Sequence, residues 1–274
     1  MDADLIISSG KNPKLKEAVD LYERRHRDAR GVFLIEGYRE ILRAYEAGVV
    51  FDALFFCKEY FLGNNEPDLI AKIGKGGVKR YECAAAIFPK LSYRDRPDGL
   101  VAVARKMARG LCDLVQHKNK EPFFVIAESI EKPGNLGTIL RSADAVQVDG
   151  VVVCDRCTDI YNPNVVRAST GALFTVPVIE EEGSLTLEWM KRQGILLVAA
   201  TPSAVMEFTE APFKGPLAIV VGTEQLGLSK RWMDASDIQV RIPMLGMADS
   251  LNVATATTLL LYEVLRQRKS IGTV

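Results

Sequence analysis

The sequence has few histidines and no regular set of cysteines. Its 274 residues include two histidines, His26 and His117, and five cysteines at scattered positions. An odd, scattered set of cysteines does not indicate a disulfide framework. The motif Cys154-Asp155-Arg156-Cys157 is alone, whereas a zinc site would need a second pair of ligands. We therefore predict no metal site and interpret this pair as two ordinary thiols that follow a buried strand.

The sequence also lacks long apolar segments. No stretch approaches the roughly 20 apolar residues that span a bilayer. The first residues, Met1-Asp2-Ala3-Asp4, lack the basic and apolar regions of a secretory signal. We expect a cytoplasmic protein with no membrane partner.

There is no excess of charge of either sign. Lysine and arginine together number 35, as do aspartate and glutamate, so the net charge is zero. The composition therefore gives no support to nucleic-acid binding, although local basic clusters can still bind phosphates. Basic residues gather within 24–30, 90–96 and 266–269. A solvated helix face explains each cluster equally well.

The pattern along the chain predicts two domains. With 48% hydrophobic and 26% charged residues, the composition is that of a globular protein. Residues 1–108 have the pattern of a small α/β domain, and the polar segment 109–121 is the expected linker. From residue 122 to 274, short apolar runs alternate with helical patterns, which predicts a parallel sheet covered on both faces. The expected strands are 123–127, 150–154, 175–179, 195–199, 217–221 and 239–242.

Three strand–loop–helix junctions of the second half carry polar residues. The segments are Ile130–Gly137, Gly222–Ser229 and Ser250–Asn252, the last at the start of an apolar helix. Helix N-termini present unpaired N–H groups, and ligands of parallel sheets bind beyond the carboxyl ends of the strands. The second segment nearly matches a phosphate-binding P-loop, but Leu228 stands where lysine is required. An α/β enzyme of another family that uses a nucleotide is therefore a less favoured interpretation.

Together these segments resemble a known family. Asn135-x-Gly137-x-x-x-Arg141, Gly222-x-Glu224-x-x-Gly227-x-Ser229 and Ile242-Pro243-Met244 with Ser250-Leu251-Asn252-Val253 are similar to the three motifs of the SpoU-type (TrmH-like) RNA ribose 2′-O-methyltransferases. The family belongs to the SPOUT superfamily, and the resemblance covers roughly the C-terminal 150 residues. It implies S-adenosylmethionine as cofactor, a C-terminal trefoil knot, and a homodimer formed through this domain.

The resemblance also implies roles for individual residues. The catalytic set is Arg141, Asn135, Glu224, Ser250 and Asn252, and the cofactor set is Gly222, Ile242, Leu251 and Val253, with Thr201 as a further loop candidate. From the residues alone, Arg141 would be a surface arginine or part of a structural ion pair, and Ile242 and Leu251 would belong to the core. Arg141 matches the arginine proposed to help deprotonate the 2′-hydroxyl, but a pKa above about 12 makes arginine a poor base. Binding of a phosphate and stabilisation of developing charge is the alternative role. Ala254 departs from the family, which often has serine there.

The N-terminal half resembles the family's substrate-binding domain, which is similar to ribosomal protein L30e. The matching segments are Asn12–Lys16, Phe33–Gly37 and Leu91–Gly99. The implied RNA contacts are Lys14, Lys16, Arg94 and Arg96, joined by Asn162 and Arg167 from the second half. An irregular loop capped by proline and glycine explains Asn162 nearly as well.

We therefore predict an S-adenosylmethionine-dependent RNA ribose 2′-O-methyltransferase that acts on ribosomal RNA. Transfer RNA as the substrate and a non-catalytic RNA-binding protein with the same fold are the alternatives. The sequence names neither the target nucleotide nor any role in antibiotic resistance.

Overall fold

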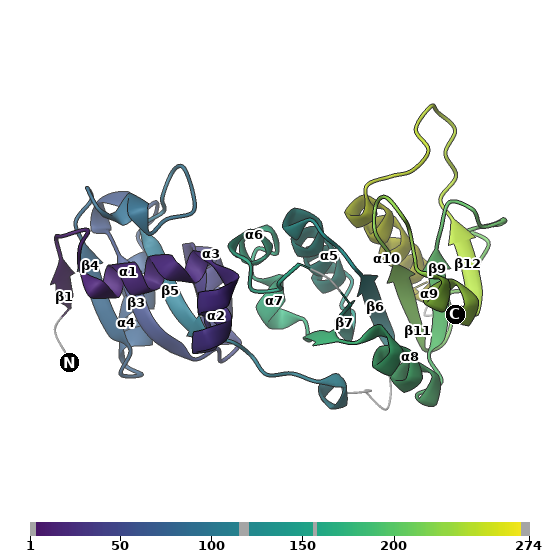
Figure 1. Cartoon of the computed structure of the whole chain (residues 1–274), viewed down its shortest axis with the longest axis horizontal. Coiled ribbons are helices and arrows are strands. Elements are labelled where there is room, and N and C mark those ends of the chain that lie inside the picture. The colour runs from purple at the N-terminus through teal and green to yellow at the C-terminus, as the bar shows by residue number, and fades with distance from the viewer. Residues whose placement is uncertain (1–3, 115–120, 156–157, 270–274) are drawn as a thin grey trace. The chain divides into compact units, whose positions relative to one another are not determined.

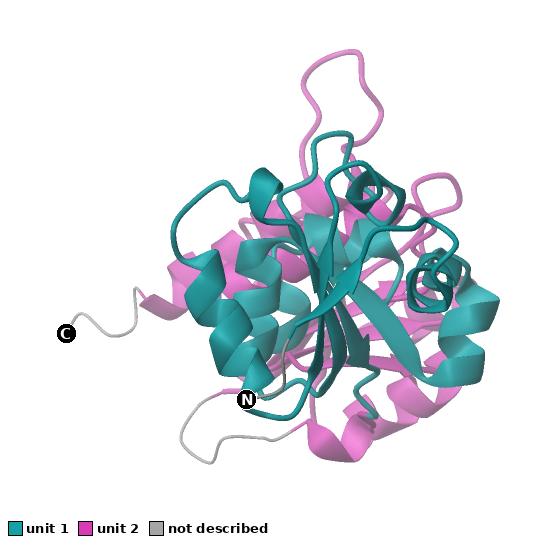
Figure 2. Ribbon diagram, turned by 90° about the vertical axis from the view of Figure 1, so that its left-hand side faces the viewer, with its two compact units in different colours: residues 1–108, 161–175 teal, residues 109–160, 176–274 magenta. Residues whose placement is uncertain are grey.

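The computed structural model describes residues 4–114, 121–155 and 158–269. The chain divides into two compact units, which Figure 2 draws in different colours. Unit 1 comprises residues 1–108 together with Tyr161–Thr175, and unit 2 comprises residues 109–160 and 176–274. A short segment from the middle of the second half therefore packs with the first half.

Unit 1 contains a mixed five-stranded sheet. The strand order is β1-β4-β3-β5-β2, and β5 is antiparallel to both of its neighbours, whereas β1, β4 and β3 are parallel. The strands are β1 (Leu5–Ile7), β2 (Val32–Glu36), β3 (Phe51–Phe56), β4 (Lys79–Cys83) and β5 (Leu100–Arg105). Alternate side chains of β5, Val101 and Val103, face one apolar core together with Phe55 of β3.

Helices and short turns complete unit 1. They are α1 (Pro13–Val19), η1 (Asp20–Tyr22), α2 (Arg24–Arg30), α3 (Tyr38–Glu46), η2 (Lys58–Tyr60), α4 (Glu66–Gly74) and η3 (Phe88–Lys90). The sequence sets clear ends to these helices. Asn12 caps α1 by accepting from the backbone N–H of Lys14 at 2.8 Å, and Pro13 follows at the first helical position. Gly31 ends α2 in the left-handed conformation, with φ of +63°.

The segment Tyr161–Thr175 packs against unit 1 through aromatic side chains. It contains α6 (Pro163–Ala168) and α7 (Ala172–Thr175). The ring of Phe33 lies 4.5 Å from that of Tyr161 and 6.2 Å from that of Phe174. The Tyr161 hydroxyl accepts from the backbone N–H of Met107 at 2.8 Å. A second attachment joins α3 to this segment, because Arg43 donates to the carbonyl of Thr170 at 2.8 Å.

The strand expected over 175–179 was placed too early. Thr175 ends α7, and β8 covers Val178–Glu181. Pro177 has no N–H to donate to a strand ladder, so pairing with the neighbouring strand begins after it.

Unit 2 contains a seven-stranded sheet in which every pair of neighbours is parallel. The strand order is β10-β12-β9-β11-β6-β7-β8. The remaining strands are β6 (Phe123–Glu128), β7 (Gly150–Cys154), β9 (Leu196–Ala200), β10 (Met206–Glu207), β11 (Leu217–Val221) and β12 (Ile238–Arg241). The expected α/β fold with a parallel sheet is confirmed, and the two-residue strand β10 was missed.

Helices cover both faces of this sheet (Figure 1). One face packs on α8 (Gly183–Arg192) and α9 (Lys230–Ala235), because Met190 and Trp232 share a core with Phe124 and Ile126. On the other face, α5 (Pro133–Ala145) and α10 (Val253–Lys269) pack against each other and against β7 and β11. None of the helices in the described parts of the chain is long and apolar enough to cross a membrane.

Part of the expected linker belongs to the core of unit 2. The turn η4 (Leu111–Asp113) is followed by Leu114, which is 4% exposed and packs in the same core as Phe124. Residues 115–120 of the expected linker lie outside the described residues.

The strand order brings the polar loops together. Strands β12, β9, β11 and β6 are consecutive and parallel, so their carboxyl ends lie along one edge of the sheet. The loops that follow these strands contain the segments around 242–252, 201, 222–229 and 130–137. This edge is therefore where a ligand of unit 2 would bind.

Candidate active site

A cavity of about 430 Å³ lies at the carboxyl edge of the sheet in unit 2. Its wall includes all five residues expected to contact the cofactor: Thr201, Gly222, Ile242, Leu251 and Val253. Ser250 also lines it. The volume is within the range of roughly 300–1,000 Å³ that is usual for small-molecule sites.

The loop from Gly222 to Gly227 folds back on itself so tightly that it requires glycine at its start. A Cβ atom added at Gly222 would lie 2.3 Å from the carbonyl oxygen of Gly227 and 2.7 Å from the backbone nitrogen of Leu228. The N–H of Thr223 donates to the carbonyl of Gly227 at 3.1 Å, and the reverse bond has the same length. Gly227 itself has a φ of +67°. The glycines therefore let this backbone form one wall of the cavity.

A buried carboxylate holds the far end of this loop. Glu128, at the end of β6, is 5% exposed, and its side chain accepts from the backbone N–H of Ser229 at 2.7 Å. A hydrogen bond to a charged acceptor is stronger than a neutral one. Glu128 was not among the predicted residues, because a carboxylate at the end of an apolar strand has no distinctive sequence signal.

A polar network joins the three motif loops beside the cavity. The Glu224 carboxylate accepts from the side-chain amides of Asn135 and Asn252, each at 2.7 Å. Asn252 also donates to the amide oxygen of Asn135 at 3.1 Å. Lys132 forms an ion pair with the other oxygen of Glu224. One carboxylate thus connects a residue from each motif.

The network keeps Glu224 ionised and places Asn252 at the start of α10. The ion pair with Lys132 is the main cause that lowers the pKa of Glu224, and the hydrogen bond from Asn135 lowers it further. The amide oxygen of Asn252 accepts from the backbone N–H groups of Ala254 and Thr255, at 3.0 and 3.4 Å. Asn252 therefore caps the helix with its oxygen and contacts the network with its nitrogen.

The two remaining residues of the expected catalytic set lie outside this network. Ser250 is exposed on the cavity wall. Arg141 is exposed on α5, six residues after Asn135, which corresponds to about 9 Å along the helix. In the described residues no hydrogen bond or ion pair joins Arg141 to Glu224.

The residues expected to contact RNA occupy different environments in unit 1. Lys16, Arg96 and Arg167 are exposed, and Lys14 is exposed but pairs with Glu17 at 2.8 Å. The side-chain oxygen of Asn162 caps α6 by accepting from the backbone N–H of Asn164 at 2.9 Å. These cations are therefore accessible, whereas Asn162 has a structural role in its helix cap.

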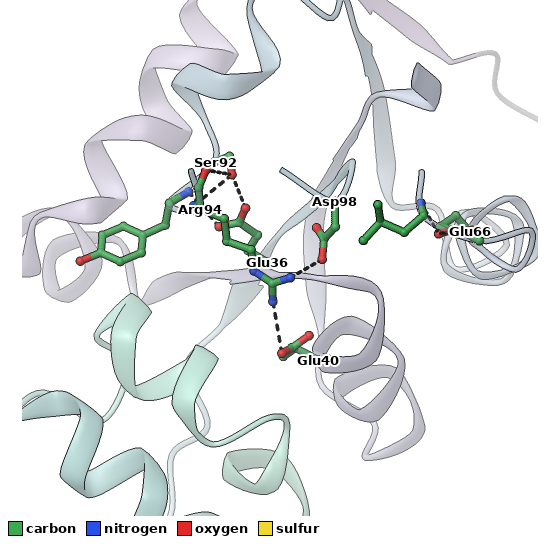
Figure 3. A network of polar contacts seen from close by, with 9 residues as sticks. Glu36, Glu40, Glu66, Ser92, Arg94 and Asp98 are labelled. Carbon is green, nitrogen blue, oxygen red and sulfur yellow. Dashed lines mark hydrogen bonds and ion pairs between the residues drawn. The ribbon is translucent and has the colours of Figure 1, made fainter. Parts of the chain in front are cut away.

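Arg94 is held by buried carboxylates, as Figure 3 shows. Its guanidinium lies 2.6 Å from Asp98 and 3.3 Å from Glu40, and both carboxylates are 8% exposed. Burial raises the pKa of Asp98, Glu40 and the nearby Glu36, although Arg94 opposes the shift in each case. Arg94 is thus committed to contacts within unit 1, and among the cations expected for RNA it is the one least available to a phosphate.

The cysteine pair Cys154 and Cys157, which was considered for metal binding, is described only in part. Cys154 is buried, and Cys157 lies outside the described residues. In the ranges 4–114, 121–155 and 158–269, no group of three or more histidine, cysteine, aspartate or glutamate residues could hold a metal ion.

Two family matches cover most of the chain. Residues 122–262 match the SpoU rRNA Methylase family, and residues 12–102 match the MRM3-like substrate binding domain. The 23S rRNA (uridine(2479)-2′-O)-methyltransferase of Streptomyces viridochromogenes is 32% identical over 258 residues, which are 91% of this chain and 88% of that protein. The putative TrmH family tRNA/rRNA methyltransferase YacO of Bacillus subtilis (strain 168) is 39% identical over 158 residues, and the chain spans only 64% of its length.

Solved structures are similar over nearly the whole chain. A crystal structure of an RNA 2′-O ribose methyltransferase is 41% identical, with a TM-score of 0.84 over 97% of this chain and 100% of that chain. The SpoU methyltransferase AviRb from Streptomyces viridochromogenes, solved in complex with AdoMet, is 31% identical, with a TM-score of 0.83 over 95% of this chain and 99% of that chain. The match over 122–262, together with the relative that aligns along nine-tenths of the sequence, shows that the chain belongs to the SpoU rRNA methylase family.

Proposed function

We propose that the chain is an S-adenosylmethionine-dependent methyltransferase that modifies a ribose 2′-hydroxyl of ribosomal RNA. The observation that supports this best is the network of Asn135, Glu224 and Asn252, which joins the three motif loops beside the cavity. The relative that aligns over 91% of the chain is a 23S rRNA 2′-O-methyltransferase, which favours ribosomal over transfer RNA. Such a substrate is present in the cytoplasm, where we expect the protein to act.

The cavity has the composition that S-adenosylmethionine requires. Ile242, Leu251 and Val253 supply apolar contacts for an adenine ring, and Gly222, which has no side chain, leaves its backbone on the cavity wall. Thr201 adds a hydroxyl to the wall. When bound, this cofactor supplies an electrophilic methyl group. AviRb, which has the same fold at 31% identity, was solved with it.

The polar residues act on the RNA in this proposal. Asn135 and Asn252 are fixed by Glu224, so their positions are set before the substrate arrives. Ser250, exposed on the wall, is placed to donate or accept a hydrogen bond from the ribose. We propose that Arg141 binds a phosphate and stabilises the negative charge that develops on the 2′-oxygen, because a guanidinium remains protonated at neutral pH.

The domain roles follow the two units. We propose that residues 1–108, as an L30e-like domain, bind the RNA together with Tyr161–Thr175, and that the rest of 122–274 transfers the methyl group. Residues 109–121 remain the proposed linker, although Leu114 packs on unit 2. Lys14, Lys16, Arg96 and Arg167 are the proposed cationic contacts.

We also propose the trefoil knot and the homodimer that the family resemblance implies. In support of the knot, β12 pairs with β9, whereas α10 packs on β11 and α5. Figure 1 shows the loop before α10 extending away from the sheet.

Exposed apolar side chains support the proposed homodimer. In the loop before α10, Leu245 and Met247 are at least 99% exposed, and Leu259 and Tyr262 on α10 are 40% and 49% exposed. Analytical ultracentrifugation tests the dimer, and a monomer at micromolar concentration would contradict it.

Two experiments test the function. Calorimetry with S-adenosylmethionine, ATP and NAD should give binding of the first alone. Mapping of ribose methylation across total RNA, from cells with and without the protein, should then show one ribosomal site that depends on it. If the dependent site lies in transfer RNA, transfer RNA is the substrate in place of ribosomal RNA. Binding of ATP or NAD without S-adenosylmethionine would overturn the proposal.

A further inference from the structure

Tyr93 of unit 1 is an exposed aromatic side chain that is held in place at both ends. Its side chain is 44% exposed. Its backbone N–H donates to the carboxylate of Glu36 at 2.8 Å, and its hydroxyl accepts from the side-chain amide of Asn164 at 2.7 Å. A solvent-exposed tyrosine usually samples several rotamers, whereas these bonds restrict this one to a single orientation.

A second aromatic ring and a cation lie next to Tyr93. The ring of Tyr22 is 5.6 Å away, and its hydroxyl donates to the carbonyl of Leu91 at 2.5 Å. The guanidinium of Arg167 lies 5.9 Å from the centre of the Tyr93 ring. Three of these side chains, Tyr22, Tyr93 and Arg167, also line a small hollow in unit 1.

The loop that carries Tyr93 is fastened by the ion pairs of Arg94 with Asp98 and Glu40. The hydroxyl of Ser92 also bonds to Glu36 (Figure 3). Buried ion pairs position groups more than they add net stability. The bonds around Arg94 therefore hold the neighbouring Tyr93 outward, beside Arg167 of α6.

We propose that Tyr93 and Arg167 form a binding site for one unpaired nucleotide of the substrate RNA, whose base stacks on the Tyr93 ring and whose phosphate contacts Arg167. This proposal rests on the proposed function and assigns a contact within it. Unpaired bases stack on aromatic rings and on guanidinium planes, whereas the bases of a duplex hide their faces. An immobilised ring loses little conformational entropy when a base binds.

The test compares the binding of single-stranded and duplex RNA by the full-length protein. The probes are a 20-nucleotide single strand of mixed sequence that contains 2-aminopurine, whose fluorescence falls on stacking, and the same strand in a duplex. Tyr93→Leu should weaken binding of the single strand about 5- to 100-fold and remove the quenching, with little change for the duplex. Tyr93→Phe keeps the ring but loses the hydrogen bond from Asn164, so it should retain the quenching and bind the single strand more tightly than Tyr93→Leu does.

Matched variants separate stacking from loss of structure. Tyr45→Leu replaces a tyrosine of the same unit that is 39% exposed, and it should leave both affinities unchanged. Arg167→Gln should weaken single-strand binding and reduce the salt dependence by about 0.7 in the logarithmic slope, the value for one phosphate contact. Calorimetry with S-adenosylmethionine shows whether each variant keeps its cofactor site.

Other outcomes would overturn the site. If Tyr93→Leu binds both probes as the unchanged protein does, or weakens both equally, no base stacks there. If Tyr93→Leu lowers only the methylation of intact ribosomal subunits and binds naked RNA normally, the surface around Tyr93 contacts a protein instead. Failure of the unchanged protein to methylate any RNA would refute the proposed function, and this result is distinct from a failure of the Tyr93 variants alone.

Discussion

At the residue scale, Glu224 is a side chain that contacts residues of both other motif loops. It is bonded to Lys132 and Asn135 from the first loop and to Asn252 from the third. Glu224, Asn135 and Asn252 could be predicted from the motifs. Lys132 could not, because its partner lies 92 positions away, and an exposed lysine in a loop has no distinctive pattern. Charged side chains are expected to be solvated, so the burial of Glu128 was also missed.

Replacing Lys132 tests how the network is ionised. Lys132→Met should raise the pKa of Glu224 toward its ordinary value of 4.5, because the ion pair is the largest cause of the lowering. Carbon-13 NMR of labelled glutamate measures this titration. Lys230→Met is the control, since that lysine pairs with Asp234 on the surface of the same unit. An unchanged titration of Glu224 would show that the ion pair does not form in solution.

Gly222→Ala tests the tight loop. The added methyl group would lie 2.3 Å from the carbonyl oxygen of Gly227, so the backbone that lines the cavity has to shift. Calorimetry should show an affinity for S-adenosylmethionine that is lower by at least about 10-fold, which is about 1.4 kcal/mol. Gly134→Ala is the control, because a Cβ at Gly134 meets no atom within 4 Å. Equal affinities for both variants would contradict the geometry of the loop.

Arg141→Ala tests the proposed role on the RNA. It should reduce methyl transfer by at least about 100-fold, the usual effect of removing a group that stabilises developing charge. Cofactor affinity should stay within a few fold, since Arg141 is not part of the cavity wall described above. Arg141→Lys keeps the positive charge and should retain part of the turnover. Unchanged turnover of the alanine variant would remove Arg141 from the mechanism.

At the scale of elements, the strands of unit 2 could be predicted more reliably than the short helices. Runs such as 123–127 and 217–221 are apolar throughout, because both faces of a central parallel strand are buried. Helix α7 has four residues, too few for a periodic pattern, so the residues before Pro177 were assigned to a strand. Similarly, the loop from Ser92 to Asp98 contains two arginines, and only the structure distinguishes the partly buried, ion-paired Arg94 from the exposed Arg96.

Arg94→Met tests the loop anchored on Asp98 and Glu40. Removing the cation from buried carboxylates should lower the free energy of unfolding by about 3 kcal/mol, the lower end for buried pairs, because a quarter of the Arg94 side chain is exposed. Burial raises the folded-state pKa of both carboxyls, so the stability they contribute is present at low pH and is lost as the pH rises through that pKa. Arg94 opposes this rise in pKa, so the carboxylates lack a partner in the variant once they ionise. The loss of stability in Arg94→Met should therefore be larger at pH 8 than at pH 5.

Urea unfolding monitored by circular dichroism measures the effect of Arg94→Met at each pH. Arg105→Met is the matched control, since its pair with Asp52 is exposed and should contribute less than about 1 kcal/mol. A loss that is the same for both variants, or that grows toward low pH, would contradict the anchoring role.

At the scale of the whole molecule, the division into units departs from the order of the sequence. A simple cut after residue 108 removes the partners of Tyr161 and Phe174, namely Phe33 and Met107. We expect residues 109–274 alone to bind S-adenosylmethionine and to lose RNA affinity, but also to aggregate through these aromatic side chains. Replacing Tyr161 and Phe174 with serine in the fragment should restore solubility, as light scattering would show. Full activity of the plain fragment on natural RNA would make the first 108 residues dispensable.

The packing of Tyr161–Thr175 on unit 1 has a consequence for engineering hybrid enzymes within the family. A recipient chain that receives a foreign N-terminal module would keep its own α6 and α7, whose apolar side chains match the original β2 and α3. The transplant therefore needs two grafts, residues 1–108 and residues 161–175, taken from the same donor.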